Sequence, residues 1–149
     1  MHLAVAETII VSAADQTCAV PQGYISEVIQ VEEKDFRMVN RVEVVPYRSG
    51  VLPVVRLASL FNRKENGQTR RSLLVLSSER GSAGLLVEKI HGQKQVVVRA
   101  LRDPLIQVPA VTGATELGDG KPVLILDCST LTSGAVRPRE GARAEAFDK

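Results

Sequence analysis

The segment TGATELGDGKPVLILD (112–127) comes nearest to a chemical motif, because two glycines five positions apart are followed by a lysine. A phosphate-binding loop needs its lysine directly after the second glycine, and then a helix whose free amides hold the anion. Here Asp119 follows Gly118, and Lys121 is followed by Pro122 and a short apolar run typical of a buried strand. Glycines also supply the positive φ angles of tight turns, so the segment predicts a β-hairpin.

The histidines and cysteines do not form a recognisable ligand set. His2 lies in the N-terminal segment and His91 at an expected break between strands, so we interpret His91 as a surface loop residue. Cys18 and Cys128 lie far apart in apolar surroundings, and the chain has no C-x-x-C motif. We therefore predict buried free thiols rather than a disulfide or a metal site.

Other reactive residue types also lack the context that catalysis requires. Ser82 lies in RGSAG, which is not the G-x-S-x-G of a nucleophile elbow. The acidic run at Glu32, Glu33 and Asp35 is typical of a solvated surface. We therefore predict no catalytic residue, no metal and no cofactor, with an enzyme of unrecognised site as the alternative.

Composition indicates a globular protein rich in β-structure. The 149 residues are 44% hydrophobic, 24% charged and only 3% aromatic, and valine is the commonest apolar type. This length suits one domain or two small coupled subdomains. The net charge of +2 is scattered, which argues against nucleic acid as a partner. Without a long apolar run or a signal peptide, we expect no membrane insertion and a cytoplasmic location.

Short apolar segments separated by turns predict a mainly β fold. Prolines within both arms of the hairpin 42–57 favour edge strands or bulges. We expect a loop at 102–111 and a disordered tail at 134–149, which is small and charged. The remaining predicted elements are hairpins at 5–20 and 72–90, a turn feeding a strand in 24–39, a strand at 93–101, and short helical turns at 57–62 and 128–133.

An internal similarity links the two halves of the chain. PVVRLASL (53–60) and PVLILDCSTL (122–131) each follow a turn containing glycine, and each joins an apolar strand to a short helical turn. Their prolines lie 69 residues apart. The pattern predicts two pseudo-equivalent halves of about five strands, each a small barrel closed by a helical turn; chance similarity is the alternative.

These segments also carry a family resemblance. GVLPVVRLASLF, GLLVEKIHGQKQVVVRAL and VTGATELGDGKPVLILDCSTL occur in an order that closely resembles the CheW-like domain of bacterial chemotaxis, over residues 8–133. Gln95 to Arg99 and Gly113 to Gly120 look more like the C-terminal regulatory domain of the histidine kinase CheA than the coupling protein CheW.

The resemblance implies a fold of two intertwined five-stranded SH3-like β-barrel subdomains with short helical turns, over residues 1–133. It also implies a non-catalytic scaffold, because the chain contains neither the phosphoacceptor nor the ATP-binding motifs of a kinase. The implied partners are CheW or CheA-type CheW-like domains, bound end to end, and the cytoplasmic tip of a chemoreceptor. A free-standing CheW-type adaptor is the alternative function.

The resemblance further implies a receptor groove between the barrels. Its candidate residues are Ile25, Glu27, Val28, Arg48 and Leu131. The alternatives are core packing for the aliphatic residues and solvated charges for the other two. If the groove assignment is right, at least one of Ile25 and Val28 should be partly exposed.

Overall fold

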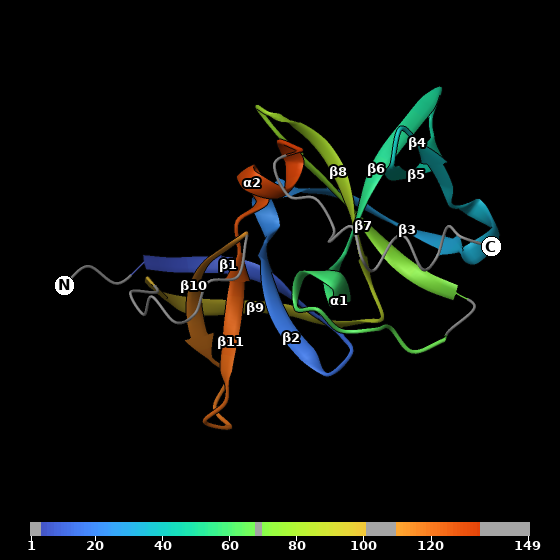
Figure 1. Cartoon of the computed structure of the whole chain (residues 1–149). Helices are drawn as coiled ribbons and strands as arrows, with labels where there is room; N and C mark the ends of the chain where they lie inside the picture. Colours follow the sequence, from blue (N-terminus) through green and yellow to red (C-terminus); the bar gives the residue numbers. More distant parts are fainter. Residues whose placement is uncertain (1–3, 68–69, 101–109, 135–149) are drawn as a thin grey trace.

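The structure, a computed structural model, describes residues 4–67, 70–100 and 110–134 (Figure 1). The predicted tail, apart from Gly134, and most of the predicted loop at 102–111 lie outside these residues. The described strands are β1 (Ala4–Ala13), β2 (Gln16–Pro21), β3 (Ile25–Glu32), β4 (Arg37–Val39), β5 (Val42–Tyr47), β6 (Gly50–Arg56), β7 (Arg70–Ser78), β8 (Gly81–Val87), β9 (Lys89–Ala100), β10 (Val111–Glu116) and β11 (Pro122–Leu126). The described helices are the 3-10 turns η1 (Gln22–Tyr24) and η2 (Glu33–Asp35), and α1 (Leu57–Leu60) and α2 (Cys128–Thr132).

The strands form two units that lie side by side (Figure 1). The first unit is a closed barrel in the order β1-β2-β11-β10-β9, and the second is a sheet in the order β3-β7-β8-β6-β5-β4. The second unit is inserted between β2 and β9, so the prediction of two intertwined, mainly β subdomains is confirmed. The second unit differs from the expected five-stranded barrel, because the short strand β4 adds a sixth member at its edge.

The turns explain why these segments form hairpins. Ala14 and Asp15 join β1 to β2 with φ of 49° and 64°, which matches the twist of paired strands. Gly118 and Gly120 have φ of 97° and 80° between β10 and β11. The predicted hairpin is confirmed, and a strand follows where a phosphate loop would need a helix.

The prolines of the β5–β6 hairpin lie where their missing N–H group is not needed. Pro53 precedes the pairing of β6 with β8, which begins at Val54. Pro46 lies beyond the pairing of β5 with β4, which ends at Val44. The predicted edge assignment is therefore wrong for β6 as a whole, but each proline occupies a stretch with a strand partner on one side only.

The internal similarity corresponds to a repeated structure. β6 pairs in parallel with β8, and β11 pairs in parallel with β2; each then leads into a short helix. When Pro53 is aligned with Pro122, the pair Val55–Leu85 coincides with the pair Leu124–Cys18. The same alignment places β3, β7, β8, β6 and β5 over β9, β1, β2, β11 and β10.

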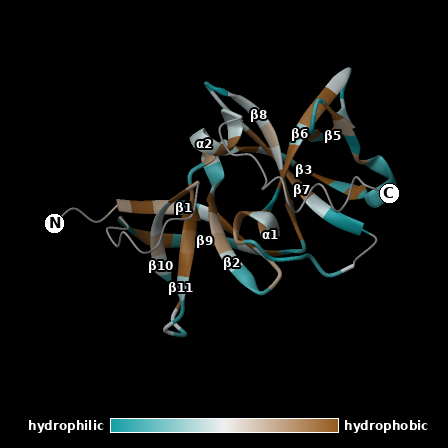
Figure 2. Ribbon diagram, in the orientation of Figure 1, coloured by the Kyte–Doolittle hydropathy of each residue, from teal (hydrophilic) through white to brown (hydrophobic). Residues whose placement is uncertain are grey.

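Three apolar clusters hold the fold, and much of β6 and β11 is hydrophobic (Figure 2). One fills the barrel around Ile10 and Ile125, and another fills the second unit around Leu73 and Leu86. The largest, which we call the shared core, lies between the units. α1, from the second unit, contacts β1 of the barrel, whereas α2, from the barrel, contacts β7 and β8. α2 therefore packs on the other unit, whereas α1 lies between its own strands β6 and β8 and strand β1 of the barrel.

Candidate functional site

Strand β3 places Val28 at the rim of the shared core. Side chains alternate along a strand, and Val31 points into the second unit. Val28 points the other way and lies opposite Leu74, which is fully buried in the shared core. Its own side chain is 46% exposed, so the expectation of a partly exposed residue here is confirmed.

A β-bulge brings Ile25 to the same face. The pairing of β3 with β7 shifts register between Ile25 and Glu27, and the hydroxyl of Ser26 donates to the carbonyl of Val75 at 3.1 Å. Because the bulge adds one residue, it changes the alternation of side chains. Ile25 is half-buried against the shared core, on the side where Val28 is exposed.

Glu27 and Arg48 are held together across the seam between β3 and β5. The Tyr47 hydroxyl and the Arg48 Nη2 atom, at 2.8 Å, both donate to Glu27 Oε2. The Arg48 guanidinium also lies 5.2 Å from the centre of the Tyr47 ring. The hydrogen bond from Tyr47, and then the one from Arg48, lower the pKa of Glu27. These charges are therefore not simply solvated, and Tyr47 is a participant that the sequence reading missed.

Leu131 does not line a surface. Its side chain is 2% exposed and packs in the shared core, so the prediction that it contributes directly to a groove is wrong. Asp127 caps α2 by accepting from the Thr130 N–H group at 3.2 Å. The hydroxyls of Ser78 and Thr132 lie 2.5 Å apart and join α2 to β7. The burial of Leu131 and the hydrogen bond between Thr132 and Ser78 together hold α2 beside β7 and β8.

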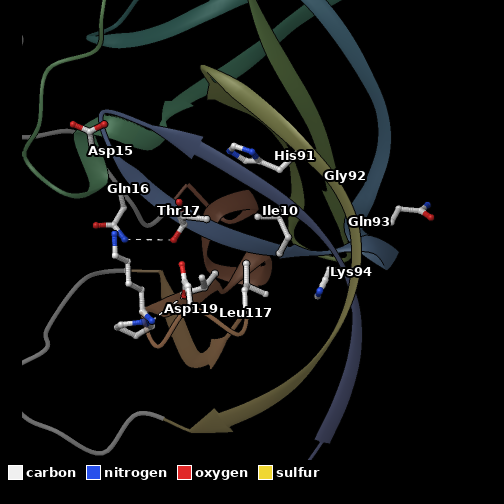
Figure 3. A pocket seen from close by; sticks show the side chains of 13 residues that line it. Ile10, Asp15, Gln16, Thr17, His91, Gly92, Gln93, Lys94, Leu117 and Asp119 are labelled. Carbon is white, nitrogen blue, oxygen red and sulfur yellow. Dashed lines mark hydrogen bonds between the residues drawn. The ribbon is translucent and has the colours of Figure 1, made fainter.

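A cavity of about 390 Å³ opens at one mouth of the barrel (Figure 3). Ile10 and Val123 contribute apolar side chains, and Lys94 and Asp119 contribute charges of opposite sign. His91 also lines it, 2.8 Å from the hydroxyl of Ser12. The predicted strand break at His91 is wrong, because β9 continues through a bulge there. The mixed charges favour no single class of ligand.

The cysteines behave as the sequence predicts. Both are buried and neither forms a disulfide. Burial raises the pKa of the Cys18 thiol to about 12, and burial followed by the charge of Asp127 does the same for Cys128. In the described part of the chain, no group of three or more histidine, cysteine or acidic side chains could hold a metal ion. Nor do the described residues contain a helix long and apolar enough to span a membrane.

Comparison with known proteins supports this geometry. The family model for the CheW-like domain matches residues 7–136. The chemotaxis protein CheA of Bacillus subtilis is 30% identical over 133 residues, and that of Rhizobium meliloti is 32% identical over 139. These matches cover 88% and 91% of this chain but 20% and 18% of the relatives. The chain thus spans about a fifth of the length of these relatives.

A solved structure shares the fold. The scaffolding protein TtCheW from Thermoanaerobacter tengcongensis superposes with a TM-score of 0.67 at 16% sequence identity. The match covers 83% of this chain and 89% of that protein. At this low sequence identity, the structural match supports the arrangement of strands but not the details of any binding surface.

Proposed function

The chain belongs to the CheW-like domain family, and from this we propose that it is the regulatory domain of a CheA-type histidine kinase. In this proposal it binds the coupling protein CheW and the cytoplasmic tip of a chemoreceptor, and it works in the cytoplasm. Chemistry would belong to other parts of the parent protein. The observation that carries the proposal is an exposed valine at the rim of the core between the two units.

Val28 and Ile25 suit a helical apolar partner. Val28 is exposed on the face of β3 opposite the buried Leu74, and Ile25 is half-buried against the shared core. An amphipathic helix that lies along such an edge extends a core that already exists, and this is a known mode of recognition. Glu27, held by Tyr47 and Arg48, lies on the opposite face of β3, because it pairs with Val75 of the second unit's own core, so it does not take part in this apolar contact.

A second surface suits a neighbouring CheW-like domain. The pairing of β4, β5 and β6 brings five exposed apolar residues to one outer face. We call this the valine–proline face: Val39, Val42, Pro46, Val51 and Pro53. Contiguous exposed apolar surface marks interaction sites, and two sheets can pack face to face through such surfaces.

A free-standing CheW-type adaptor is the second candidate, favoured by the similarity of the fold to a CheW scaffolding protein. Both candidates use the same two surfaces, so domain binding does not distinguish them. The reading frame upstream of Met1 does. A kinase core encoded in that frame supports the regulatory domain, and a promoter supports the adaptor.

Charged substitutions at the rim test the receptor assignment. Val28→Glu and Ile25→Glu would each place a carboxylate against the partner's apolar helix, at a desolvation cost of roughly a few kcal/mol. We expect receptor pull-down to fall strongly for both. The melting temperature of Val28→Glu should hardly change, because exposed substitutions shift stability by about 0.5 kcal/mol.

Val51→Glu is the matched control, since it also charges an exposed valine, on the valine–proline face. It should weaken binding to CheW and leave receptor binding intact. If Val28→Glu is stable and still binds the receptor, the rim assignment fails. Measurable ATP turnover by this chain alone would instead favour an enzyme with an unrecognised site.

A further inference from the structure

The segment after α1, residues 62–66, bridges the two units. It leaves the helix at Asn62, whose φ of 57° turns the chain. The Arg63 N–H group then donates to the carbonyl of Ala58 at 3.0 Å. None of these five residues belongs to the apolar clusters of the described structure. We call residues 62–66 the strap.

Charged side chains anchor the strap to the second unit. Oε1 of Glu65 accepts from Nη1 of Arg71 at 2.9 Å and from Nη1 of Arg56. The side chains of Glu65 and Arg71 are 10% and 8% exposed. Oε2 of Glu65 is buried and has no hydrogen-bond partner. Release of the strap would hydrate this oxygen, and that gain offsets part of the lost ion pairs.

Glu88 anchors the strap to the barrel. Its Oε2 atom accepts from the Asn66 N–H group at 3.2 Å, and its Oε1 atom accepts from the N–H group of Ala14 in the β1–β2 turn. Nη1 of Arg63 donates to the carbonyl of the same Ala14 at 2.9 Å. One carboxylate therefore ties the strap and the barrel turn together.

The internal repeat shows which part of the barrel lies next to the strap. Leu74 corresponds to Val11, because they pair with the equivalent residues Leu85 and Cys18. Their partners on β3 and β9, Val28 and Ile90, are therefore equivalent. Glu88 lies two residues before Ile90 and corresponds to Ile25, since its N–H group bonds the carbonyl of Ser12 at the end of β1. The strap thus contacts one position of the barrel's counterpart of the candidate groove, Glu88, and leaves the other, Ile90, exposed.

We propose that residues 62–66 are a releasable strap, held by charged side chains, that joins the two units beside the barrel-side counterpart of the candidate groove. Attachment joins the units at Glu88, and release separates them there without opening the shared core. Hydrogen bonds and ion pairs of a segment outside the apolar clusters can break locally, whereas buried apolar packing opens only with the whole domain.

Amide hydrogen exchange of the whole chain, measured at single residues, tests the strap. In Glu65→Gln and Glu88→Gln, exchange of the Asn66 N–H group should rise about tenfold or more, because a hydrogen bond or ion pair to a charged group is lost. The Ala14 N–H group should follow in Glu88→Gln. Amides of Leu74 and Leu85 in the shared core should keep their protection.

Lys64→Gln is the control, because Lys64 is an exposed strap residue and its substitution should leave all these rates unchanged. Unchanged exchange at Asn66 in both glutamine variants overturns the proposal. Equal loss of protection at Leu74 and Leu85 also overturns it, because the strap would then be part of the cooperative core. The measurement needs no partner, so it stands or fails independently of the proposed scaffold function.

Discussion

The two units share one strand plan but close it in different ways. In the barrel, β9 pairs with both β1 and β10, so no edge remains. In the second unit, the equivalent strand β3 pairs with β7 and does not pair with β5. Side chains bridge that seam instead, with Tyr47 and Arg48 bound to Glu27. Backbone closure in one unit is thus replaced by side-chain closure in the other.

The interiors differ accordingly. Where the barrel holds aliphatic or hydroxyl side chains, the second unit holds charges at equivalent positions: Arg56 for Ile125, Glu43 for Thr115 and Arg71 for Thr8. In the barrel, the Thr8 hydroxyl donates to the carbonyl of Lys94, its partner on the neighbouring strand β9, at 2.8 Å. In the second unit, Arg56 binds Glu43 through two atoms, at 2.7 and 2.8 Å, and its guanidinium lies 4.8 Å from the Phe36 ring centre. A sheet that does not close its backbone uses a charge network to hold its open end.

The largest effect should come from breaking that network. Arg56→Ile copies the barrel residue Ile125 but leaves Glu43 without its donors, and should lower the free energy of unfolding by about 3–5 kcal/mol. The double variant Arg56→Ile/Glu43→Thr copies both barrel residues and should recover at least half of that loss. Urea denaturation of the variants measures the difference. A double variant no more stable than the single one would show that the charges are not coupled.

A smaller loss of stability should follow from adding a side chain at Gly113, where β10 pairs with β9 to close the barrel. A Cβ atom at Gly113 would lie 2.7 Å from the carbonyl oxygen of Arg99, on the neighbouring strand β9. Backbone cannot move aside without separating β10 from β9, so Gly113→Ala should cost roughly 1–3 kcal/mol. A Cβ atom at Gly84 in the second unit would lie 2.7–2.9 Å from three side-chain atoms of the buried Leu73. A side chain can shift more easily than a paired backbone, so Gly84→Ala should cost less. The melting temperatures of the two variants measure the difference. A larger loss for Gly84→Ala than for Gly113→Ala would contradict the idea that the pairing of β9 with β10 is rigid.

The smallest effect concerns the exposed seam. The pKa of Glu27 is lowered from 4.5, so the seam contact is present above the ordinary carboxyl range and is lost as pH falls through the lowered value. Acid titration of Glu27 by NMR should give a midpoint below 4.5. Tyr47→Phe should move this midpoint upward, because the Tyr47 hydrogen bond is the largest cause of the shift. A wild-type midpoint at or above 4.5 would contradict a closed seam.

The sequence predicted the fold through local signals. Turn residues such as Gly118 and Gly120 fixed the hairpins, and the repeated Pro-Val-apolar pattern at Pro53 and Pro122 revealed the two halves. These features act within a few residues, so one sequence suffices to read them. The continuation of β9 through His91 was missed, because a bulge beside glycine resembles a break.

The site was harder to predict because it depends on contacts between distant residues. The exposure of Val28 and the burial of Leu131 follow from the docking of two units, which no local pattern encodes. The role of Tyr47 required the seam between β3 and β5. The strap could not be predicted for the same reason. In the sequence, Glu65 and Glu88 resemble ordinary surface charges, and only the structure shows their partners.

The packing of α2 on the second unit bears on how the chain is made. The strands of the second unit leave the ribosome in one continuous stretch, but α2, which packs on β7 and β8, is formed only from residues 128–132. The barrel must likewise wait for β9, whose Lys94 bonds a threonine 86 positions earlier. Such distant pairing slows folding, and the faces of β7 and β8 that pack against α2 stay uncovered until residues 128–132 have been made. The nascent chain therefore carries its greatest risk of aggregation in the interval between completing β8 and completing α2.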